Sequence, residues 1–364
     1  MKRIFLLAGA RPNYMKVFPL WREIRAHHPD LTPVLVHTGQ HYDPVMNDVF
    51  FRDFGMPAPD HFLGIGSGPH GAQTGRTMIA LEELFTRERP ELLVVVGDVN
   101  STLAGTLVAI KMGIPVAHVE AGLRSGDRAM PEEINRLATD AIADLLLTPS
   151  RDADANLLRE GVAPDKIRFV GNVMIDSLLQ LLPRAAGSTV LEQHQLTPRA
   201  YVAVTLHRPS NVDDPARLAL LLDQLGALAA DLPIVFPVHP RTRNALPQRP
   251  APGDQLQLIE PLGYLDFLRL QSEAALVITD SGGIQEETSY LGIPCLTLRA
   301  NTERPITITQ GTNRLLDLDQ QSLQQAAREA LLRFPPTADR RPPTIELWDG
   351  QTAPRVIAAL RSHL

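Results

Sequence analysis

The stretch ELLVVVGDVNSTLAGTLVAIKMGIPVAHVEAG, residues 91–122, decides the fold class of this chain. Residues 91–98 and 114–122 are short runs rich in Val, Leu and Ile, which is typical of strands buried on both faces. The segment 101–113 between them is expected to be a helix, and it ends at Gly113, a residue suited to a helix C-terminus. Such a strand–helix–strand unit predicts a parallel sheet covered by helices.

The same alternation runs along the whole chain and restarts once. The further predicted strands are 2–10, 32–39, 144–150 and 166–172 in a first set, and 201–209, 232–240, 256–263, 274–282 and 293–299 in a second set. Two successive sets predict an α/β fold of two doubly wound, Rossmann-like parallel domains that face each other across a cleft.

We expect the domain boundary in the less regular stretch that contains Pro and Gly near residues 172–200. The first domain is then 1–172, and the second is 173–349. The final helical segment, 350–364, is a candidate addition to the first domain.

Composition narrows the function before any motif is considered. The net charge of −6 argues against a broad surface for nucleic acid or another polyanion. No run approaches the roughly 20 apolar residues of a membrane span. The single cysteine, Cys295, excludes an intramolecular disulfide and fits a cytoplasmic protein; its strand-like surroundings predict a small core residue.

Charged and small residues follow the predicted strands of the first domain, where ligands bind in doubly wound sheets. Arg11 and Lys16 follow the first strand and are candidates for binding an anion. Asp98 directly follows the strand that ends at Gly97, as a candidate acid–base group. An ordinary charged loop, or a cap for the next helix, would explain each of them singly.

Residues 118–136, HVEAGLRSGDRAMPEEINR, add more unlike charge at the end of a buried strand. Glu120 emerges at the strand end, and Glu132 and Arg136 stand four residues apart at the start of a predicted helix. A surface ion pair with dipole complementarity would explain the two helix residues. It does not explain Glu120, so an active-site loop is the competing interpretation.

The second domain has three such strand ends. His207 and His239 each follow a strand, and two histidines at successive strand ends are harder to treat as structural than one. The stretch TDSGGIQEETSYLG (279–292) then predicts a nucleotide site. Ser281, Gly282 and Gly283 bring backbone amides and a helix N-terminus to a diphosphate, and Glu287 stands one turn later, in reach of ribose hydroxyls. A routine glycine-rich turn is the plainer alternative.

The remaining motifs give little support for a dinucleotide or metal site. GSGPHG (66–71) matches a dinucleotide fingerprint, but it follows no predicted strand, and Pro69 and His70 stand where a helix should open. The sequence has no phosphate-binding lysine loop, no zinc-binding helix motif and no cysteine pair, so neither a metal nor a redox cofactor is expected.

Taken together, these motifs resemble the non-hydrolysing UDP-N-acetylglucosamine 2-epimerases over nearly the whole chain. The matching stretches are GARPNYMK, HTGQHYD, VVGDVNST, HVEAGLRSGD, PEEINR, GNVMIDS, TLHRPSN, PVHPRTR, TDSGGIQEE and TERP. The resemblance implies a fold of the GT-B type, a UDP-sugar substrate bound between the domains, no cofactor and a cytoplasmic homodimer.

The resemblance also implies roles for the candidate residues. Asp98, Glu120, Glu132 and His207 match the family's catalytic positions. The substrate-binding candidates are Arg11, Lys16, Arg136, His239, Ser281, Gly282, Gly283 and Glu287. The implied chemistry is inversion at C2 through elimination of UDP, which gives 2-acetamidoglucal, followed by re-addition. Which carboxylate takes the C2 proton stays open.

Two departures from effector-regulated members of the family leave regulation and substrate open. Tyr42 and Asp43 replace an Arg and a Glu, and Leu206 and Pro209 replace a Gly and a second Arg. Activation by the substrate is therefore in doubt, and a UDP-2,3-diacetamido-glucuronate 2-epimerase is an alternative. A hydrolysing epimerase, a glycosyltransferase of the same fold and a non-catalytic sensor are further alternatives with weaker support.

Overall fold

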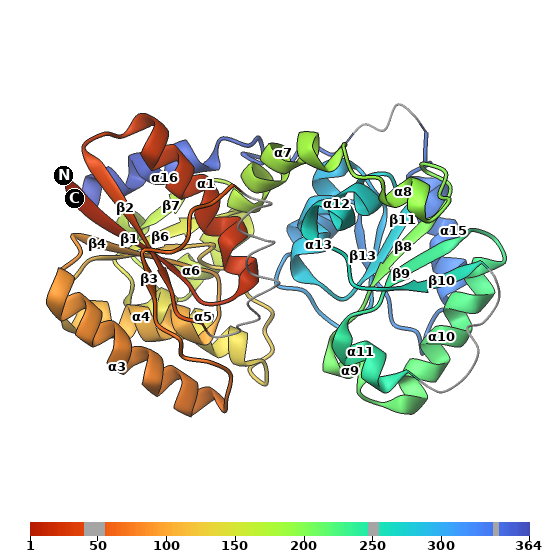
Figure 1. Cartoon of the computed structure of the whole chain (residues 1–364), viewed down its shortest axis with the longest axis horizontal. Coiled ribbons are helices and arrows are strands. Elements are labelled where there is room, and N and C mark those ends of the chain that lie inside the picture. The colour runs from red at the N-terminus through yellow and green to blue at the C-terminus, as the bar shows by residue number, and fades with distance from the viewer. Residues whose placement is uncertain (40–54, 247–254, 338–341) are drawn as a thin grey trace. The chain divides into compact units, whose positions relative to one another are not determined.

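The fold is given by a computed structural model, which describes residues 1–39, 55–246, 255–337 and 342–364, apart from the side chains of Arg11 and Arg241. The chain divides into two units: unit 1 is residues 1–179 with 346–364, and unit 2 is residues 180–345. Figure 1 labels their helices and strands. Each unit has its own parallel sheet and hydrophobic core, which confirms the predicted α/β class.

Unit 1 contains a seven-stranded parallel sheet in the order β3-β2-β1-β4-β5-β6-β7. Its strands are β1 (Lys2–Ala8), β2 (Leu31–His37), β3 (His61–Phe62), β4 (Leu92–Val96), β5 (Val116–Val119), β6 (Leu145–Thr148) and β7 (Ile167–Phe169). All five residues of β4 are buried, as its apolar sequence predicts. The order reverses between β1 and β4, so a switch point lies at the carboxyl ends of these two strands.

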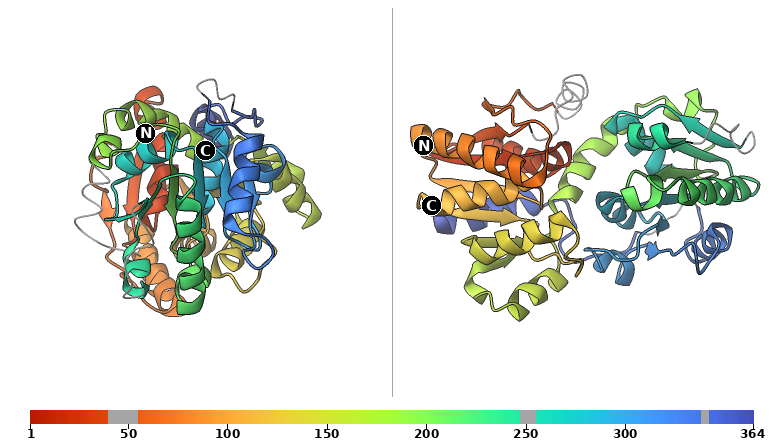
Figure 2. Two further views of the ribbon diagram at one scale, coloured as in Figure 1. Left: turned by 90° about the vertical axis from the view of Figure 1, so that its right-hand side faces the viewer. Right: turned by 90° about the horizontal axis from the view of Figure 1, so that it is seen from below.

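Helices cover both faces of this sheet. They are α1 (Arg11–His27), α3 (His70–Glu88), α4 (Asn100–Lys111), α5 (Pro131–Ile142), α6 (Arg151–Arg159), α7 (Val173–Ala185) and α16 (Thr352–Leu360), with short 3₁₀ turns η1 (Pro164–Lys166) and η2 (Arg361–His363). In Figure 1, α3, α4 and α5 lie below the sheet, while α1 and α16 lie above it. Figure 2 shows α3 and α4 side by side from below. Helix α3 opens at His70, directly after Pro69, where the sequence argued against a helix start.

Unit 2 contains a six-stranded parallel sheet in the order β10-β9-β8-β11-β12-β13. Its strands are β8 (Val202–Thr205), β9 (Ile234–Pro237), β10 (Leu256–Ile259), β11 (Leu276–Thr279), β12 (Cys295–Thr297) and β13 (Asn313–Leu315). Here the order reverses between β8 and β11, which defines a second switch point.

The helices of unit 2 again lie on both faces of the sheet. They are α8 (Val190–Gln193), α9 (Pro209–Val212), α10 (Pro215–Ala229), α11 (Pro240–Ala245), α12 (Tyr264–Ser272), α13 (Gly282–Leu291), α14 (Ile306–Thr309) and α15 (Leu323–Arg333). One core lies between the sheet and α10 with α15, and another involves α8 and α12.

The last part of the chain returns to unit 1 and is fixed there by buried polar contacts. Both carboxylate oxygens of Asp176 accept hydrogen bonds from the backbone at the start of α16, from Thr352 N (3.1 Å) and Ala353 N (2.7 Å). The indole of Trp348 donates to the carbonyl oxygen of Pro149 over 3.0 Å. The two chain termini lie close together (Figures 1 and 2), and Lys2 Nζ donates to the carbonyl oxygen of Leu364.

Gly171 makes this return possible, and its replacement by alanine tests the docking. Gly171 has φ of 93°, and a Cβ there would lie 2.2 Å from the carbonyl oxygen of Leu347. Gly171→Ala must displace a backbone, so we expect it to lower the free energy of unfolding by on the order of 3 kcal/mol. Gly161→Ala is the matched control, because Gly161 has φ of 85° but open space around it. Equal losses in urea unfolding of the two variants would contradict the clash.

Candidate functional site

The switch point of unit 1 joins the loop after β1 to the loop after β4. Asn13 accepts hydrogen bonds from Gly9 N (3.1 Å) and Ala10 N (2.9 Å) and donates to the carbonyl oxygen of Val96 (3.2 Å). The turn at Gly97 has φ of 65°. These bonds fix the backbone from which Asp98 projects.

Lys16 and Glu120 form a buried ion pair beside this turn. Their side chains are 10% and 5% exposed, and Lys16 Nζ donates to Glu120 Oε2. A Cβ at Gly97 would lie 2.7 Å from Lys16 Nζ and 3.5 Å from Glu120 Oε2, which places both groups against the turn. Glu120 itself adopts φ of 71°, a left-handed conformation that is strained for glutamate. The backbone therefore holds the Glu120 carboxylate next to the Asp98 turn.

Asp98 pairs with Arg136, which enters from α5. The guanidinium of Arg136 donates to Asp98 Oδ2 and to Glu133, and it is almost completely buried. Arg136 thus pairs with Glu133, three residues away, and contacts Asp98 across 38 positions of sequence. Glu132 is exposed in the first turn of the same helix. Glu120 and Lys16 are thus brought together against the Gly97 turn, and Arg136 is a partner of Asp98 on the next residue.

A second buried pair, His118 and Asp140, contacts the backbone of the Gly97 turn. His118, on β5, has Nδ1 2.6 Å from Asp140 Oδ1 and Nε2 2.8 Å from the carbonyl oxygen of Gly97. Burial raises the pKa of Asp140, but His118 and Arg124 outweigh that effect and hold this pKa below its usual range. His118 and Asp140 could not be recognised as a pair from the sequence, because nothing in their local pattern indicates the contact.

Amide side chains complete the loop after β4. Asn135 Nδ2 donates to the carbonyl oxygen of Asp98 (3.0 Å) and to Asn100 Oδ1 (3.1 Å). Asn100 Nδ2 donates to Gln73 Oε1 (2.8 Å), and Gln73 Nε2 donates to the carbonyl oxygen of Gly66 (2.8 Å). The glycine-rich segment that resembles a dinucleotide fingerprint is thereby tied to the Asp98 loop through α3.

His37, at the end of β2, gives a pH-dependent prediction for unit 1. Its ring is buried and stacks between Tyr14 and Phe62 at centroid distances of 5.1 and 5.3 Å. Among the described residues, its Nε2 has no hydrogen-bond partner. Burial lowers the pKa of His37 from 6.5 to about 4, so the unfolded chain takes up a proton at a higher pH than the folded one. The contribution of neutral His37 to the free energy of unfolding is complete above pH 6.5 and is lost as the pH falls toward 4.

We expect the titration of His37 to lower the free energy of unfolding by about 2 kcal/mol when the pH is reduced from 7.5 to 5.0. His37→Phe keeps the stacked ring and removes the titration. Urea unfolding of the two proteins at both pH values measures the difference. The same pH dependence in both would show that His37 does not titrate in this range.

The switch point of unit 2 gathers the nucleotide candidates. Asp280 follows β11, Ser281 is the N-cap residue of α13, and Gly282 and Gly283 form its first turn. A Cβ at Gly282 would lie 2.6 Å from Arg304 Nη1. Arg304 forms ion pairs with Glu303 and, over 2.9 Å, with Glu286. A side chain at position 282 would therefore have to displace the buried Arg304 guanidinium.

Glu287 is buried one turn into α13. Tyr264 donates its hydroxyl to Glu287 Oε1 (3.0 Å), and Gln271 Nε2 donates to Oε2 (2.8 Å). Burial raises the pKa of Glu287, and the hydrogen bonds from Gln271 and Tyr264 oppose this rise. Each carboxylate oxygen keeps a further lone pair, so the group can accept from two hydroxyls of a ligand.

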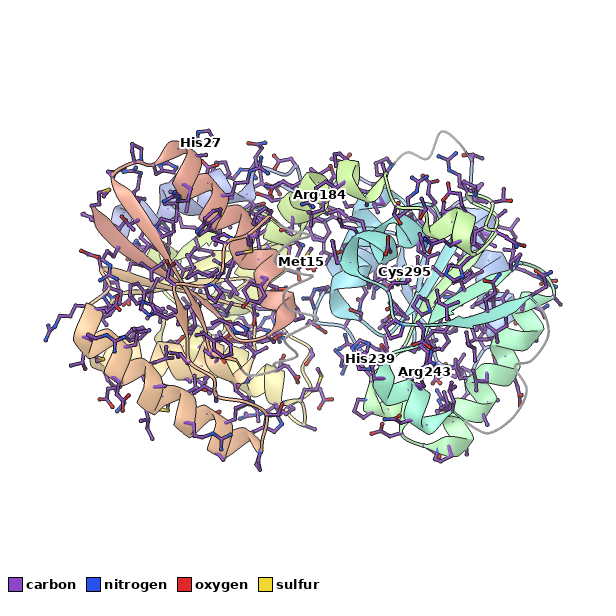
Figure 3. All side chains as sticks on the ribbon, viewed as in Figure 1. Met15, His27, Arg184, His239, Arg243 and Cys295 are labelled. Atoms are coloured by element: carbon purple, nitrogen blue, oxygen red, sulfur yellow. The ribbon has the colours of Figure 1, made fainter. Side chains whose placement is uncertain are left out.

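The two histidines of unit 2 lie together at neighbouring strand ends. The rings of His207 and His239 have their centroids 5.7 Å apart. His239 comes directly before α11 and is labelled in Figure 3. Cys295, also labelled there, is buried in β12, and burial raises the pKa of its thiol to about 11. The cysteine is a core residue, as its sequence context predicts.

Over the described segments, no group of three or more His, Cys, Asp or Glu side chains is arranged to hold a metal ion. No helix among them is long and apolar enough to cross a membrane. The side chain of Arg11, and residues Tyr42 and Asp43, lie outside what the structure describes, so the expectations placed on them stay predictions.

Comparison with known protein families assigns the chain to one family. The sequence model described as UDP-N-acetylglucosamine 2-epimerase matches residues 22–361. The chain belongs to this epimerase family. Its members are isomerases that act on a UDP-sugar, which confirms the family predicted from the motifs.

The similar proteins include relatives named for each of the two candidate substrates. The UDP-N-acetylglucosamine 2-epimerase of Methanocaldococcus jannaschii is 42% identical over 89% of this chain and 91% of its own length. The UDP-2,3-diacetamido-2,3-dideoxy-D-glucuronate 2-epimerase of Pseudomonas aeruginosa is 40% identical over 90% of this chain and 92% of its own. The crystal structure of the M. jannaschii enzyme with UDP-GlcNAc and UDP matches with a TM-score of 0.87 and 39% identity over all of both chains.

Proposed function

We propose that this protein is a non-hydrolysing UDP-N-acetylglucosamine 2-epimerase, which interconverts UDP-GlcNAc and UDP-ManNAc. Family membership over nearly the whole chain carries the proposal. The strand-end carboxylates Asp98 and Glu120 in unit 1, and the helix start at Ser281 in unit 2, support it. No metal or redox cofactor takes part in the proposed reaction.

In this mechanism, the forward step is an elimination. A carboxylate of unit 1 removes the proton from C2 while the C1–O bond breaks. The electron pair of the C1–O bond leaves with UDP. A C1=C2 double bond forms, which gives 2-acetamidoglucal. Because the C2 proton is weakly acidic, the developing positive charge at C1 must assist its removal. In the reverse step, UDP adds back at C1 as a proton is delivered to the opposite face of C2.

Two opposed faces require more than one proton-handling group. We assign this role to Asp98, Glu120 and Glu132, without fixing which of them acts on which face. Arg136 and Lys16 form ion pairs with Asp98 and Glu120, which supports them as partners of the acids in addition to contacts with the substrate.

The proposed UDP site is in unit 2. Backbone amides at Ser281, Gly282 and Gly283, with the N-terminal end of α13, stabilise the diphosphate. Glu287 accepts from the ribose hydroxyls. His239 and Arg11 contact the diphosphate, and His207 acts at the leaving group.

A UDP-2,3-diacetamido-glucuronate nucleotide is the second candidate substrate, favoured by the P. aeruginosa relative. NMR of the purified protein in D₂O with each nucleotide distinguishes the two. We expect one of them to yield a second sugar nucleotide with deuterium at C2 and without accumulation of free UDP. A C2 position that stays protiated through many turnovers would exclude the elimination, and free UDP that accumulates with the product would indicate hydrolysis.

We also propose that the enzyme works as a homodimer in the cytoplasm, with a UDP-sugar as its substrate and without nucleic-acid or membrane partners. Ile79 on α3 and Ile134 on α5 are exposed apolar side chains of unit 1, which supports an interface formed by this unit. Light scattering of the purified protein measures the mass, and a monomer at micromolar concentration would exclude a stable dimer.

A further inference from the structure

Asp280 is a fully buried carboxylate at the switch point of unit 2, between the last residue of β11 and the Ser281 cap of α13. It accepts hydrogen bonds from His207 N (3.1 Å), Arg208 N (2.9 Å) and Asn211 Nδ2 (3.0 Å). Its other contact is with a side chain, because Asp280 Oδ1 lies 3.2 Å from His207 Nδ1. One carboxylate thus holds both the backbone and the ring of a candidate catalytic residue.

The charge of Asp280 follows from these contacts. Burial raises its pKa, but His207, the Arg208 amide and Asn211 outweigh burial and lower this pKa below its usual range. A carboxylate only accepts hydrogen bonds, so the facing Nδ1 of His207 must carry a proton. Nε2 is then the nitrogen available to a ligand, on a side chain that is 42% exposed. Among the described side chains, His239 also lies near the ring, at 5.7 Å between centroids.

We propose that Asp280 is a positioning residue for the epimerase reaction, which fixes the His207 ring with Nδ1–H toward Asp280 and leaves Nε2 available to the diphosphate site at Ser281. This rests on the proposed function. When the ring carries both protons, Nε2–H donates a hydrogen bond to the β-phosphate oxygen that leaves C1, and no proton has to be transferred for this effect. A buried carboxylate behind an imidazole serves elsewhere to set both its tautomer and its charge.

A purely structural role is the competing explanation, because Asp280 also joins the loop after β8 to α13. Asp280→Asn separates the two, since the asparagine oxygen still accepts from a backbone amide while its NH₂ group opposes Nδ1–H. We expect kcat to fall about 100-fold with KM changed less than about threefold, and the acidic and basic limbs of the kcat–pH profile to move. His207→Asn with Asp280→Asn should be no slower than His207→Asn alone.

Asn211→Ala is the matched control. It removes one hydrogen bond to Asp280 and one to the carbonyl oxygen of Leu298 (3.0 Å) but leaves the contact between His207 and Asp280. We expect it to lower Tm as much as Asp280→Asn does while kcat stays within about threefold of wild type. Equal losses of kcat in the two variants, or effects of His207→Asn and Asp280→Asn that multiply, would overturn the positioning role.

The ring tautomer tests the proposal without substrate and without a variant. Nitrogen-15 NMR of His207 in the full-length protein, assigned by its loss in His207→Asn, should show the Nδ1–H form on the basic side of its titration. The Nε2–H form would overturn the proposal even in an active epimerase. If neither UDP-sugar is turned over but the Nδ1–H form is present and UDP shifts the His207 resonances, the pairing stands and the proposed substrate is what fails.

Discussion

Replacing Glu120 by glutamine lowers kcat by about a thousandfold, because the variant keeps the shape of the side chain and loses a group able to take or deliver the C2 proton. The effect on KM is small, since the contact that is lost belongs to the transition state. Deuterium incorporation at C2 of the substrate pool should fall in parallel with turnover. The measurement is initial rates by NMR in H₂O and D₂O at the same protein concentration.

Two further variants separate this loss of activity from a loss of structure. Glu120→Gln leaves the buried ammonium of Lys16 without its ion pair, which costs about 3 kcal/mol of stability. Adding Lys16→Met should restore much of that stability and none of the activity. Glu160→Gln, at an ion pair between Arg124 and a side chain that is 38% exposed, should change kcat less than twofold. Recovery of activity in the double variant would remove Glu120 from the proton-transfer step.

Replacing Glu287 by alanine weakens UDP binding by about 100-fold, which is the loss of two charge-assisted hydrogen bonds to the ribose. The sharper test compares UDP with 2′-deoxy-UDP by calorimetry. Wild type should prefer UDP by about tenfold or more, and Glu287→Ala should bind the two with nearly equal affinity. Tyr264→Phe removes only the 3.0 Å hydrogen bond to Oε1 and should give a smaller loss. A preference for UDP that persists in Glu287→Ala would exclude this carboxylate as the ribose acceptor.

The sequence was enough to predict the sheets, because buried parallel strands are continuous apolar runs. It missed β3 and β13, which contain two and three residues. Strands that short at a sheet edge carry little burial signal, and β13 contains Asn313 and Arg314. The start of α3 differs from the prediction for a different reason. The presence of Pro69 argues against a helix inside this segment, but Pro69 is the N-cap residue of α3, and proline is compatible with a position at the very start of a helix.

The candidate site was predictable where position alone decides it, at the carboxyl ends of parallel strands. Asp98, Glu120, His207 and Ser281 all lie there. Partners could not be predicted, because they depend on how distant elements pack. Lys16 pairs with Glu120, which is 104 positions away in the sequence. His118 contacts Asp140 because β5 packs against α5. Arg136 shows the same limit, since helical spacing suggested Glu132 and the fold supplies Glu133 and Asp98.

The docking of α16 on unit 1 has a consequence for biosynthesis. Unit 2 is an insertion between two pieces of unit 1, so residues 180–345 must be synthesised before unit 1 has all of its parts. Asp176 cannot accept its hydrogen bonds from Thr352 N and Ala353 N until the whole of unit 2 has been synthesised. A product that stops just after residue 345 would thus contain a complete unit 2 attached to an incomplete unit 1, and we expect chaperones and proteases to act on it. Because the two ends of the chain adjoin, they can be linked, and new termini can be opened in a surface loop. Such a circular permutant would change the order in which the parts of unit 1 and unit 2 are synthesised.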